Sequence, residues 1–167
     1  MKRLIKIVLS ISFILYLFAL LVLLFLGTRG NVWADLTLLE YIKSSSNFVP
    51  FKTISTYTNA IFNGSMNMDI PIKNLVGNLI MFLPMGIYLP YFIKRMNKVS
   101  IFSISMIILL LVIEVIQIVI RRGSFDIDDF ILNMLGALIG FGLSKMKFVQ
   151  KLLKYNRGDS SFADKSL

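Results

Sequence analysis

The sequence predicts an all-α membrane protein: a bundle of four transmembrane helices with a long extracytoplasmic loop that carries short interfacial helices. Composition is the first reason, because 56% of the 167 residues are hydrophobic, 16% are charged and the mean hydropathy is +0.76. A soluble core of this size cannot bury that much apolar surface. The second reason is the presence of four apolar runs of about the length that crosses the roughly 30 Å hydrocarbon layer as a helix. The third is the sorting of lysine and arginine to one side.

The four runs divide the chain into four regions. The runs are Leu4 to Leu26, Ile72 to Ile93, Ile101 to Ile120 and the shorter Ile127 to Leu143. The regions are a first transmembrane helix with a cytoplasmic basic N-terminus (1–26), an extracytoplasmic aromatic loop (27–71), a core of three helices (72–143) and a cytoplasmic basic amphipathic tail (144–167). The first run is longer than the apolar stretch of a signal peptide and has no convincing cleavage site after it, so we expect an uncleaved span.

The basic residues predict the orientation of the chain. If the N-terminus is cytoplasmic, the inner segments hold twelve of the 18 lysines and arginines. These twelve are Lys2, Arg3, Lys6, Lys94, Arg95, Lys98, Lys145, Lys147, Lys151, Lys154, Arg157 and Lys165. Because such residues accumulate on the cytoplasmic side of membrane proteins, we expect both termini in the cytoplasm. The same sorting accounts for the formal net charge of +9, which therefore does not indicate nucleic-acid binding.

The loop between the first two spans is expected to lie flat on the outer surface. Asp35 is the expected N-cap of one short helix, and Asn63-Gly64 is the expected end of a second. Aromatic side chains that favour the headgroup level recur along the loop, namely Trp33, Tyr41, Phe48, Phe51 and Tyr57. The loop is interpreted as a structural lid, with the gating of a ligand as the alternative.

The chain contains no cysteine and no histidine. Their absence excludes disulfides, thiolate nucleophiles, imidazole metal ligands and the catalytic triads that depend on histidine. The remaining chemistry belongs to carboxylates, arginine, amides and hydroxyls. We expect no cofactor and no metal, because a hard cation needs about six oxygen ligands and the aspartates of the fourth span supply only part of such a shell.

Polar residues inside the spans predict a pocket that opens to the outer leaflet. Ionisable groups within a membrane are costly, so each is a functional-site hypothesis. The polar residues at one common level are Glu114 and Gln117 of the third span, Asn133 of the fourth, and Asn74 and Asn78 of the second. Arg121 follows on the same helical face as Glu114 and Gln117. The alternative role of Glu114 is that of a polar contact that only holds the helices together.

The fourth span begins with acids and continues as a stripe of small residues. The residues of the stripe, spaced by three or four positions, are Asp126, Asp129, Asn133, Gly136 and Gly140. This stripe is expected to pack against the polar face of the third span. The acids Asp126, Asp128 and Asp129 can also cap the helix and pair with Arg121 and Arg122, which is the structural alternative to a role in ligand binding.

Pro84 predicts a kink in the second span. Proline has no N–H to donate, so a carbonyl near Ile80 is expected to be free for another partner. Gly77 and Gly86 are expected to allow close packing around this kink.

Four segments, in order along the chain, resemble the signature blocks of the VanZ-like family. They are NFVPFKTI (Asn47 to Ile54), NLVGNLIMFLPMGIYLP (Asn74 to Pro90), Glu114-x-x-Gln117 and RRGSFDIDDFILNMLGALIG (Arg121 to Gly140). The matching positions expected to be structural are Asn47, Pro50, Phe51, Phe82, Pro84, Gly86, Gly136 and Gly140. The resemblance implies a small multi-pass protein of the bacterial cytoplasmic membrane. The namesake of the family is associated with low-level resistance to teicoplanin, a glycopeptide antibiotic with an acyl chain, and no catalytic mechanism is implied.

The residues and the resemblance together favour a site for an amphiphile. The candidate ligand-binding residues are Asn78, Glu114, Gln117, Arg121, Arg122, Asp126, Asp128, Asp129 and Asn133. They would bind a charged or hydroxylated head group while its chain stays in lipid, as in lipid-linked cell-wall intermediates and lipoglycopeptides. The main hypothesis is a non-enzymatic membrane protein with a role in teicoplanin or lipoglycopeptide resistance, or in cell-envelope homeostasis.

Two other functions stay open. One is an intramembrane enzyme that acts on a lipid-linked substrate, with Glu114, Asp126 and Asp129 as the candidate catalytic residues. The other is a small transporter, although four spans leave little room for alternating access unless the protein forms homo-oligomers.

Overall fold

The computed structural model describes residues 2–26, 36–121 and 123–154. Nearly all of these residues are helical, and the only β-type pairing among them is an isolated bridge between Asn47 and Asp126. The elements are α1 (Lys2–Leu21), the π-helical turn η1 (Val22–Leu26), α2 (Leu38–Ser45), α3 (Lys52–Asn63), α4 (Asp69–Met81), α5 (Leu83–Phe92), the 3-10 turn η2 (Lys94–Asn97), α6 (Val99–Val119), α7 (Ile127–Lys145) and α8 (Lys147–Lys154).

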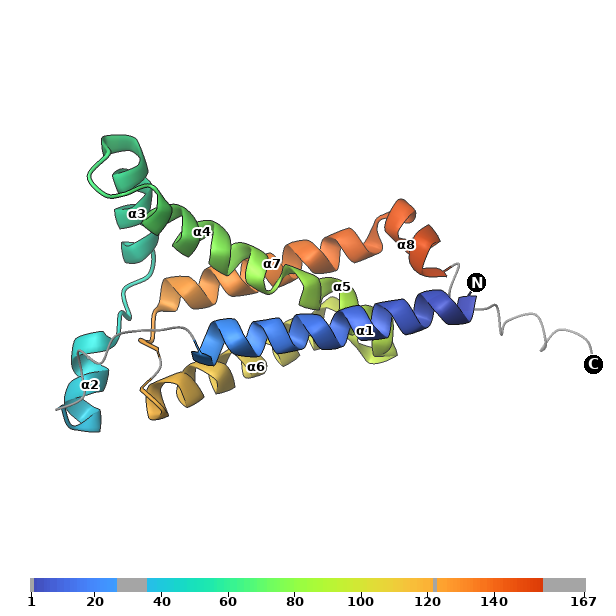
Figure 1. The fold of residues 1–167 in the computed structure, drawn as a ribbon, viewed down its shortest axis with the longest axis horizontal. Helices are drawn as coiled ribbons and strands as arrows, with labels where there is room; N and C mark the ends of the chain where they lie inside the picture. Colours follow the sequence, from blue (N-terminus) through green and yellow to red (C-terminus); the bar gives the residue numbers. More distant parts are fainter. Residues whose placement is uncertain (1, 27–35, 122, 155–167) are drawn as a thin grey trace, which may run out of the picture.

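Within the described residues, four helical segments are long and apolar enough to cross a membrane. They are Lys6–Leu26, Asp69–Phe92, Val99–Val119 and Ile127–Lys145. Figure 1 shows them running along the long axis of the molecule, with α2 and α3 at one end and the N-terminus and α8 at the other. We call these the loop end and the terminal end. The predicted all-α bundle of four spans is confirmed.

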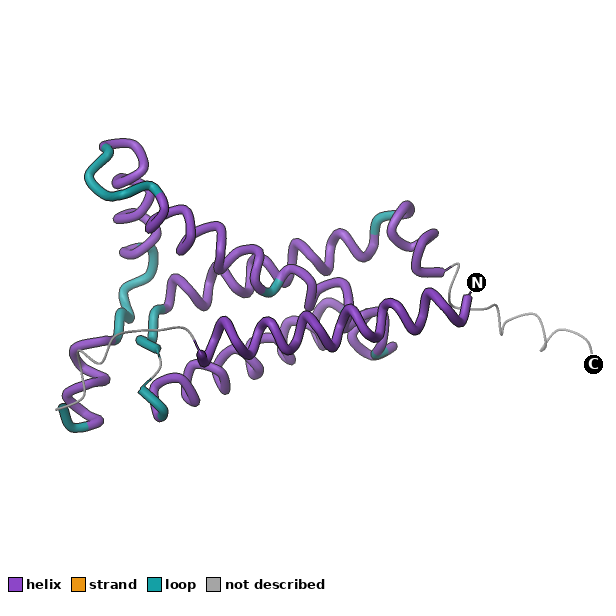
Figure 2. The backbone as a smooth tube through the Cα atoms, in the orientation of Figure 1, coloured by secondary structure: helices purple, strands orange, loops and turns teal. Residues whose placement is uncertain are grey.

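The second span is broken into two helices at Phe82. Pro84 is near the start of α5, where a missing N–H does no harm, so the chain ends α4 at Met81 and begins a new helix. The break appears as a short loop within the span in Figure 2. The expected freed carbonyl is that of Met81 rather than Ile80: the hydroxyl of Tyr16 on α1 donates to it at 2.9 Å, whereas the carbonyl of Ile80 accepts from the backbone N–H of Phe82.

Glycines bring α7 into backbone contact with the second span. A Cβ atom at Gly136 would overlap the carbonyl of Leu79, one at Gly140 would overlap the carbonyl of Leu83, and one at Gly86 would overlap the backbone of α7. The prediction that the stripe packs against the third span is therefore wrong for Gly136 and Gly140, because the space that glycine leaves is filled by the backbone of α4 and α5. Gly77 has nothing within 4 Å of a Cβ position, so it plays no part in this packing.

The centre of the bundle is apolar. Its buried side chains come from α1, the second span, α6 and α7, and they include Phe82, Phe102, Met106, Leu110 and Phe141. The rings of Phe102 and Phe141 stack with their centroids 4.8 Å apart. This core lies beside a polar cavity, on the side toward the terminal end, and its packing sets the spacing of the helices that line the cavity.

Of the two loop helices, α2 begins at a different N-cap from the predicted one, and α3 ends where predicted. The N-cap of α2 is Thr37 and not Asp35, which lies outside the described residues. The side chains of Thr37 and Glu40 form a capping box, and these hydrogen bonds from Thr37 hold the pKa of the Glu40 carboxyl below its usual value. As predicted, α3 ends at Asn63, with Gly64 in the left-handed conformation at φ 60°.

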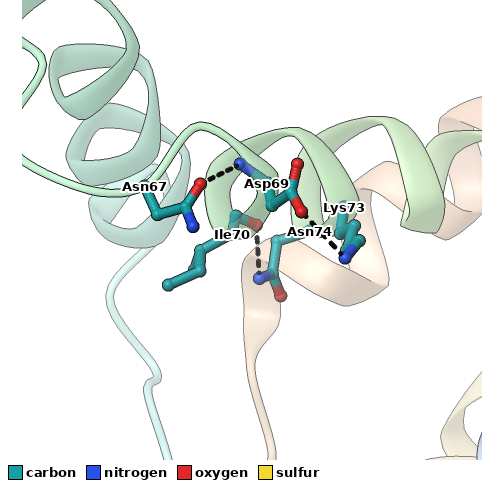
Figure 3. A network of polar contacts seen from close by, with 5 residues as sticks. All are labelled: Asn67, Asp69, Ile70, Lys73 and Asn74. Atoms are coloured by element: carbon teal, nitrogen blue, oxygen red, sulfur yellow. Dashed lines mark hydrogen bonds and ion pairs between the residues drawn. The ribbon is translucent and has the colours of Figure 1, made fainter.

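The second span begins at Asp69, earlier than the predicted Ile72, because polar side chains support its first turn. Figure 3 shows the Asn67 side-chain oxygen accepting from the N–H of Asp69 at 3.2 Å and the ion pair of Asp69 with Lys73 at 3.3 Å. The amide of Asn74 donates to the carbonyl of Ile70 at 2.9 Å. Asn74 is thus bonded within its own helix.

Candidate ligand-binding site

A cavity of about 50 Å³ lies between η1, α4, α6 and α7. Its apolar wall comes from the end of the first span, from α4 and from α6. The lining residues are Leu23, Leu24, Asn78, Met81, Leu110, Ile113, Glu114, Gln117, Ser124, Asp129 and Asn133. The presence of Ser124 and Asp129, next to the turn between α6 and α7, places the cavity toward the loop end.

Polar side chains of three spans meet in this cavity. Asn78 reaches it from α4, Glu114 and Gln117 from α6, and Asp129 and Asn133 from α7. These five are among the nine candidate ligand-binding residues, and the structure brings them together at one level. Glu114, Gln117 and Asn133 are all buried, with exposed fractions of 7%, 8% and 5%.

The side-chain N–H groups of two cavity amides already donate a hydrogen bond within the protein. The Asn78 amide donates to the Asp129 carboxylate. The Gln117 amide donates to the carbonyl of Leu24 at 2.8 Å, where the first span ends in the π-helical turn η1. Among the described residues, the side-chain oxygen of Asn133 has no hydrogen-bond partner. A buried polar atom without a partner costs about 1–3 kcal/mol, so this oxygen is a group that a ligand or water would stabilise.

Arg121 does not continue the polar face of α6. The helix ends at Val119, and Arg121 follows in the left-handed conformation with φ 54° and an exposed side chain. The expected helical spacing therefore no longer applies to it, and it is not among the described residues that line the cavity. Arg122 lies outside the described residues.

Asp126 and Asp128 lie outside the cavity and hold the loop. Asp126 is the N-cap of α7 and accepts from the N–H of Asp128 at 2.9 Å, as predicted for a capping residue. It also accepts from the amide of Asn47 at 3.1 Å and from the hydroxyl of Thr53 at 2.6 Å. Two acids expected at the ligand site thus bind residues of the loop instead.

Asp128 acts as the N-cap of a helix that is distant in sequence. Its carboxylate is fully buried and accepts from the N–H groups of Phe51 at 2.6 Å, Thr53 at 2.7 Å and Ile54 at 3.1 Å. These are the first donors of α3, whose own N-cap residue, Phe51, offers no side-chain acceptor. The carboxylate therefore satisfies donors that α3 cannot satisfy itself.

Backbone pairing completes this attachment. The N–H of Asn47 donates to the carbonyl of Phe125 at 2.7 Å, and the N–H of Ile127 donates to the carbonyl of Asn47 at 3.0 Å. We call Asn47, Thr53, Asp126 and Asp128 the loop clamp. It joins residues 47–54 to the start of α7.

The aromatic residues of the loop do not share one environment. Tyr41 is buried, and its hydroxyl donates to the carbonyl of Gly123, so its predicted place among the headgroups is wrong. Phe48 and Phe51 are exposed, and the ring of Phe48 stacks on Phe125 at a centroid distance of 5.0 Å. Trp33 lies outside the described residues.

Comparison with known proteins assigns the chain to a family. A profile of the VanZ/LLP1 family matches residues 13–149. The chain belongs to the VanZ/LLP1 family. It is 28% identical over 142 residues to Protein VanZ of Enterococcus faecium, an alignment that covers 83% of this chain and 76% of that protein. No solved structure matches the chain.

The part of the chain that matches the VanZ/LLP1 family includes both the cavity and the loop clamp. Sequence reasoning missed Thr53, which binds Asp126, and Leu24, whose carbonyl binds Gln117. The available signal for the clamp was the start of α3, where no serine, threonine, asparagine or aspartate occupies the cap position. When a helix has no capping side chain of its own, an acceptor from another part of the chain is expected to bind its first N–H groups.

The candidate carboxylates of this VanZ/LLP1 protein are divided between the cavity and the loop clamp. Within the described residues no three acidic side chains converge on a common point. Of the candidate catalytic set, Glu114 and Asp129 line the cavity, while Asp126 is engaged in the loop clamp. The arrangement offers hydrogen-bonding groups and two carboxylates in an otherwise apolar wall.

Proposed function

We propose that this protein binds the polar head of an amphiphile in the cavity without chemical turnover, and that this binding lowers susceptibility to lipid-tailed glycopeptides such as teicoplanin. Membership of the VanZ/LLP1 family and the similarity to Protein VanZ support the biological role. The loop end is proposed to face outward, so that the cavity opens toward the outer leaflet of the bacterial cytoplasmic membrane.

The observation that carries the proposal is the convergence of polar side chains from three spans on one cavity. Asn133 is the sharpest case, since its oxygen is buried and has no partner among the described residues. Side chains that only hold helices together would be expected to satisfy one another. An unfilled acceptor beside two carboxylates instead fits a site that receives a donor from a ligand.

The size of the cavity limits what can enter it. A volume of about 50 Å³ has room for only a few water molecules, because a cavity needs roughly 10–15 Å³ to hold one. A whole antibiotic or lipid head group is much larger. The cavity therefore fits one hydroxyl, amide or ammonium group of a larger head, while the acyl chain stays among the lipids.

Susceptibility of a bacterium that expresses the protein tests this function. Wild-type protein should raise the minimal inhibitory concentration of teicoplanin more than that of a glycopeptide without an acyl chain. Asn133→Leu, which replaces the amide by an apolar group of similar size, should return the value to that of the empty vector, and Asn78→Leu should act in the same direction.

Asn74→Leu is the matched control, because Asn74 is an asparagine of the same helix as Asn78 but its amide donates to Ile70 outside the cavity. This variant should keep full protection at equal membrane abundance. If Asn133→Leu and Asn78→Leu still gave full protection against teicoplanin, the cavity would not be needed for that protection. Loss of protection in all three would indicate a general folding defect rather than a site.

A further inference from the structure

The turn before α3 exposes apolar side chains on a non-helical backbone. Phe48, Val49 and Phe51 have exposed fractions of 65%, 58% and 62%. We call residues 48–51 the loop tip. Phe51 adopts φ 63°, a conformation that non-glycine residues seldom take, and it persists only where the surrounding structure holds it.

The backbone N–H groups of residues 49–54 are satisfied within the protein. Asp128 accepts from three N–H groups, those of Phe51, Thr53 and Ile54. The N–H of Val49 donates to the Asn47 side chain at 3.3 Å, and that of Lys52 donates to the carbonyl of Val49 at 3.4 Å. Pro50 has no N–H to satisfy. The tip thus combines an apolar outer surface with backbone N–H groups that, from Val49 onward, need no hydrogen bond from water.

This combination is what a non-helical segment requires to enter lipid. Unsatisfied backbone groups are what normally exclude irregular segments from the hydrocarbon region. We propose that the loop tip inserts Phe48, Val49 and Phe51 into the adjacent leaflet of the bilayer, and that Asp128 makes this insertion possible by satisfying the backbone. The inference does not depend on the ligand proposed above.

The position of the tip identifies lipid as its occupant. The tip lies at the loop end, where α7 begins, and Phe48 stacks on Phe125 directly before that helix. The apolar surface of the tip is therefore adjacent to the surface of the spans, much of which is exposed isoleucine, leucine and valine. A free polar partner has no charged group to bind on these three side chains, whereas acyl chains match them.

Spin labels measure the depth of the tip directly. The chain contains no cysteine, so Phe48→Cys, Phe51→Cys and Ser55→Cys each give one labelling position. Ser55 is exposed on α3, one helical turn beyond Phe51, and provides the matched control. The proteins are placed in vesicles of phosphatidylethanolamine and phosphatidylglycerol without glycopeptide, and collisions with oxygen and with a water-soluble nickel complex are compared.

Labels at positions 48 and 51 should collide with oxygen at least severalfold more, relative to the nickel complex, than the label at position 55. In the Asp128→Asn background this ratio should fall toward the value of position 55, because the amide cannot accept from all three backbone donors. Nickel accessibility at positions 48 and 51 equal to that at position 55 would overturn the inference. The inference would also be overturned if the labels at positions 48 and 51 were shielded from the nickel complex only after teicoplanin is added, because the tip would then bind the antibiotic rather than lipid.

Discussion

Asp128 shows how one residue can serve a distant element. It lies in the first turn of its own helix, where a carboxylate is expected to interact with local N–H groups. Instead it accepts from residues up to 77 positions away and is fully buried. A buried carboxylate is tolerated when several donors surround it, and here three backbone N–H groups do so.

Replacing this carboxylate should therefore be far more damaging than replacing an exposed one. Asp128→Ala leaves three backbone donors of α3 without their acceptor, and we expect a loss of about 3 kcal/mol or more, since each buried unsatisfied group costs about 1–3 kcal/mol. Asp69→Ala is the control, because Asp69 is also an acid in the first turn of a helix but forms only an exposed ion pair with Lys73. It should change stability by no more than about 0.5 kcal/mol.

Reversible unfolding in detergent micelles, followed by far-UV circular dichroism, measures both changes. Protease cleavage between α2 and α4 adds a local readout, because residues 47–54 should become accessible in Asp128→Ala alone. Equal stability of the two variants would mean that α3 is held by its apolar contacts and not by the carboxylate.

At the level of elements, the first span is attached at places where helices are irregular. The π-helical turn at its end offers the carbonyl of Leu24 to Gln117, and the break between α4 and α5 offers the carbonyl of Met81 to Tyr16. Irregular helix in a membrane needs such donors, because lipid supplies none. Near the middle of α1, Ser12 and Tyr88 share a hydrogen bond of 2.7 Å. These three side-chain bonds connect the first span to the bundle.

The α7 contact with the second span depends instead on backbone proximity. Gly136→Ala puts a Cβ atom onto the carbonyl of Leu79, which belongs to a helix and cannot move alone. We expect a loss of about 1–3 kcal/mol from this overpacking and a lower Tm in detergent. Gly77→Ala meets nothing within 4 Å and should be neutral or slightly stabilising, because alanine favours helix over glycine by up to about 1 kcal/mol. A Tm for Gly136→Ala equal to that of Gly77→Ala would contradict this close contact.

At the scale of the whole molecule, the sequence predicts the features that depend on hydropathy and on helical periodicity. The four spans follow from apolar runs that only lipid can cover, and the gathering of Asn78, Glu114 and Asn133 follows from their similar depth in three helices. The partner of Asp128 could not be predicted, because its donors are backbone groups brought close only by the packed loop. Arg121 was misplaced because the helical spacing was extended past the predicted end of the span at Ile120, whereas the backbone of Arg121 is left-handed.

The distribution of charge over the whole molecule predicts its orientation. The described basic residues of the terminal end include Arg3, Lys6, Lys94, Arg95, Lys98, Lys145, Lys147 and Lys151, and the described residues of that end include no carboxylate. Lys145 donates to Asn97 at 2.8 Å, which joins two basic segments that are distant in sequence. Because lysine and arginine are retained on the cytoplasmic side, this end should face the cytoplasm.

Labelling of intact cells with a membrane-impermeant maleimide tests this orientation. Ser55→Cys, at the loop end, should react in intact cells, whereas Lys147→Cys, at the terminal end, should react only after the membrane is permeabilised. Both positions are exposed in the structure, so access to the reagent depends on the side of the membrane and not on burial. Reaction of Lys147→Cys in intact cells would place the cavity in the inner leaflet. An extracellular antibiotic head could then not reach it, and the proposed function would fail even though the fold and the family would stand.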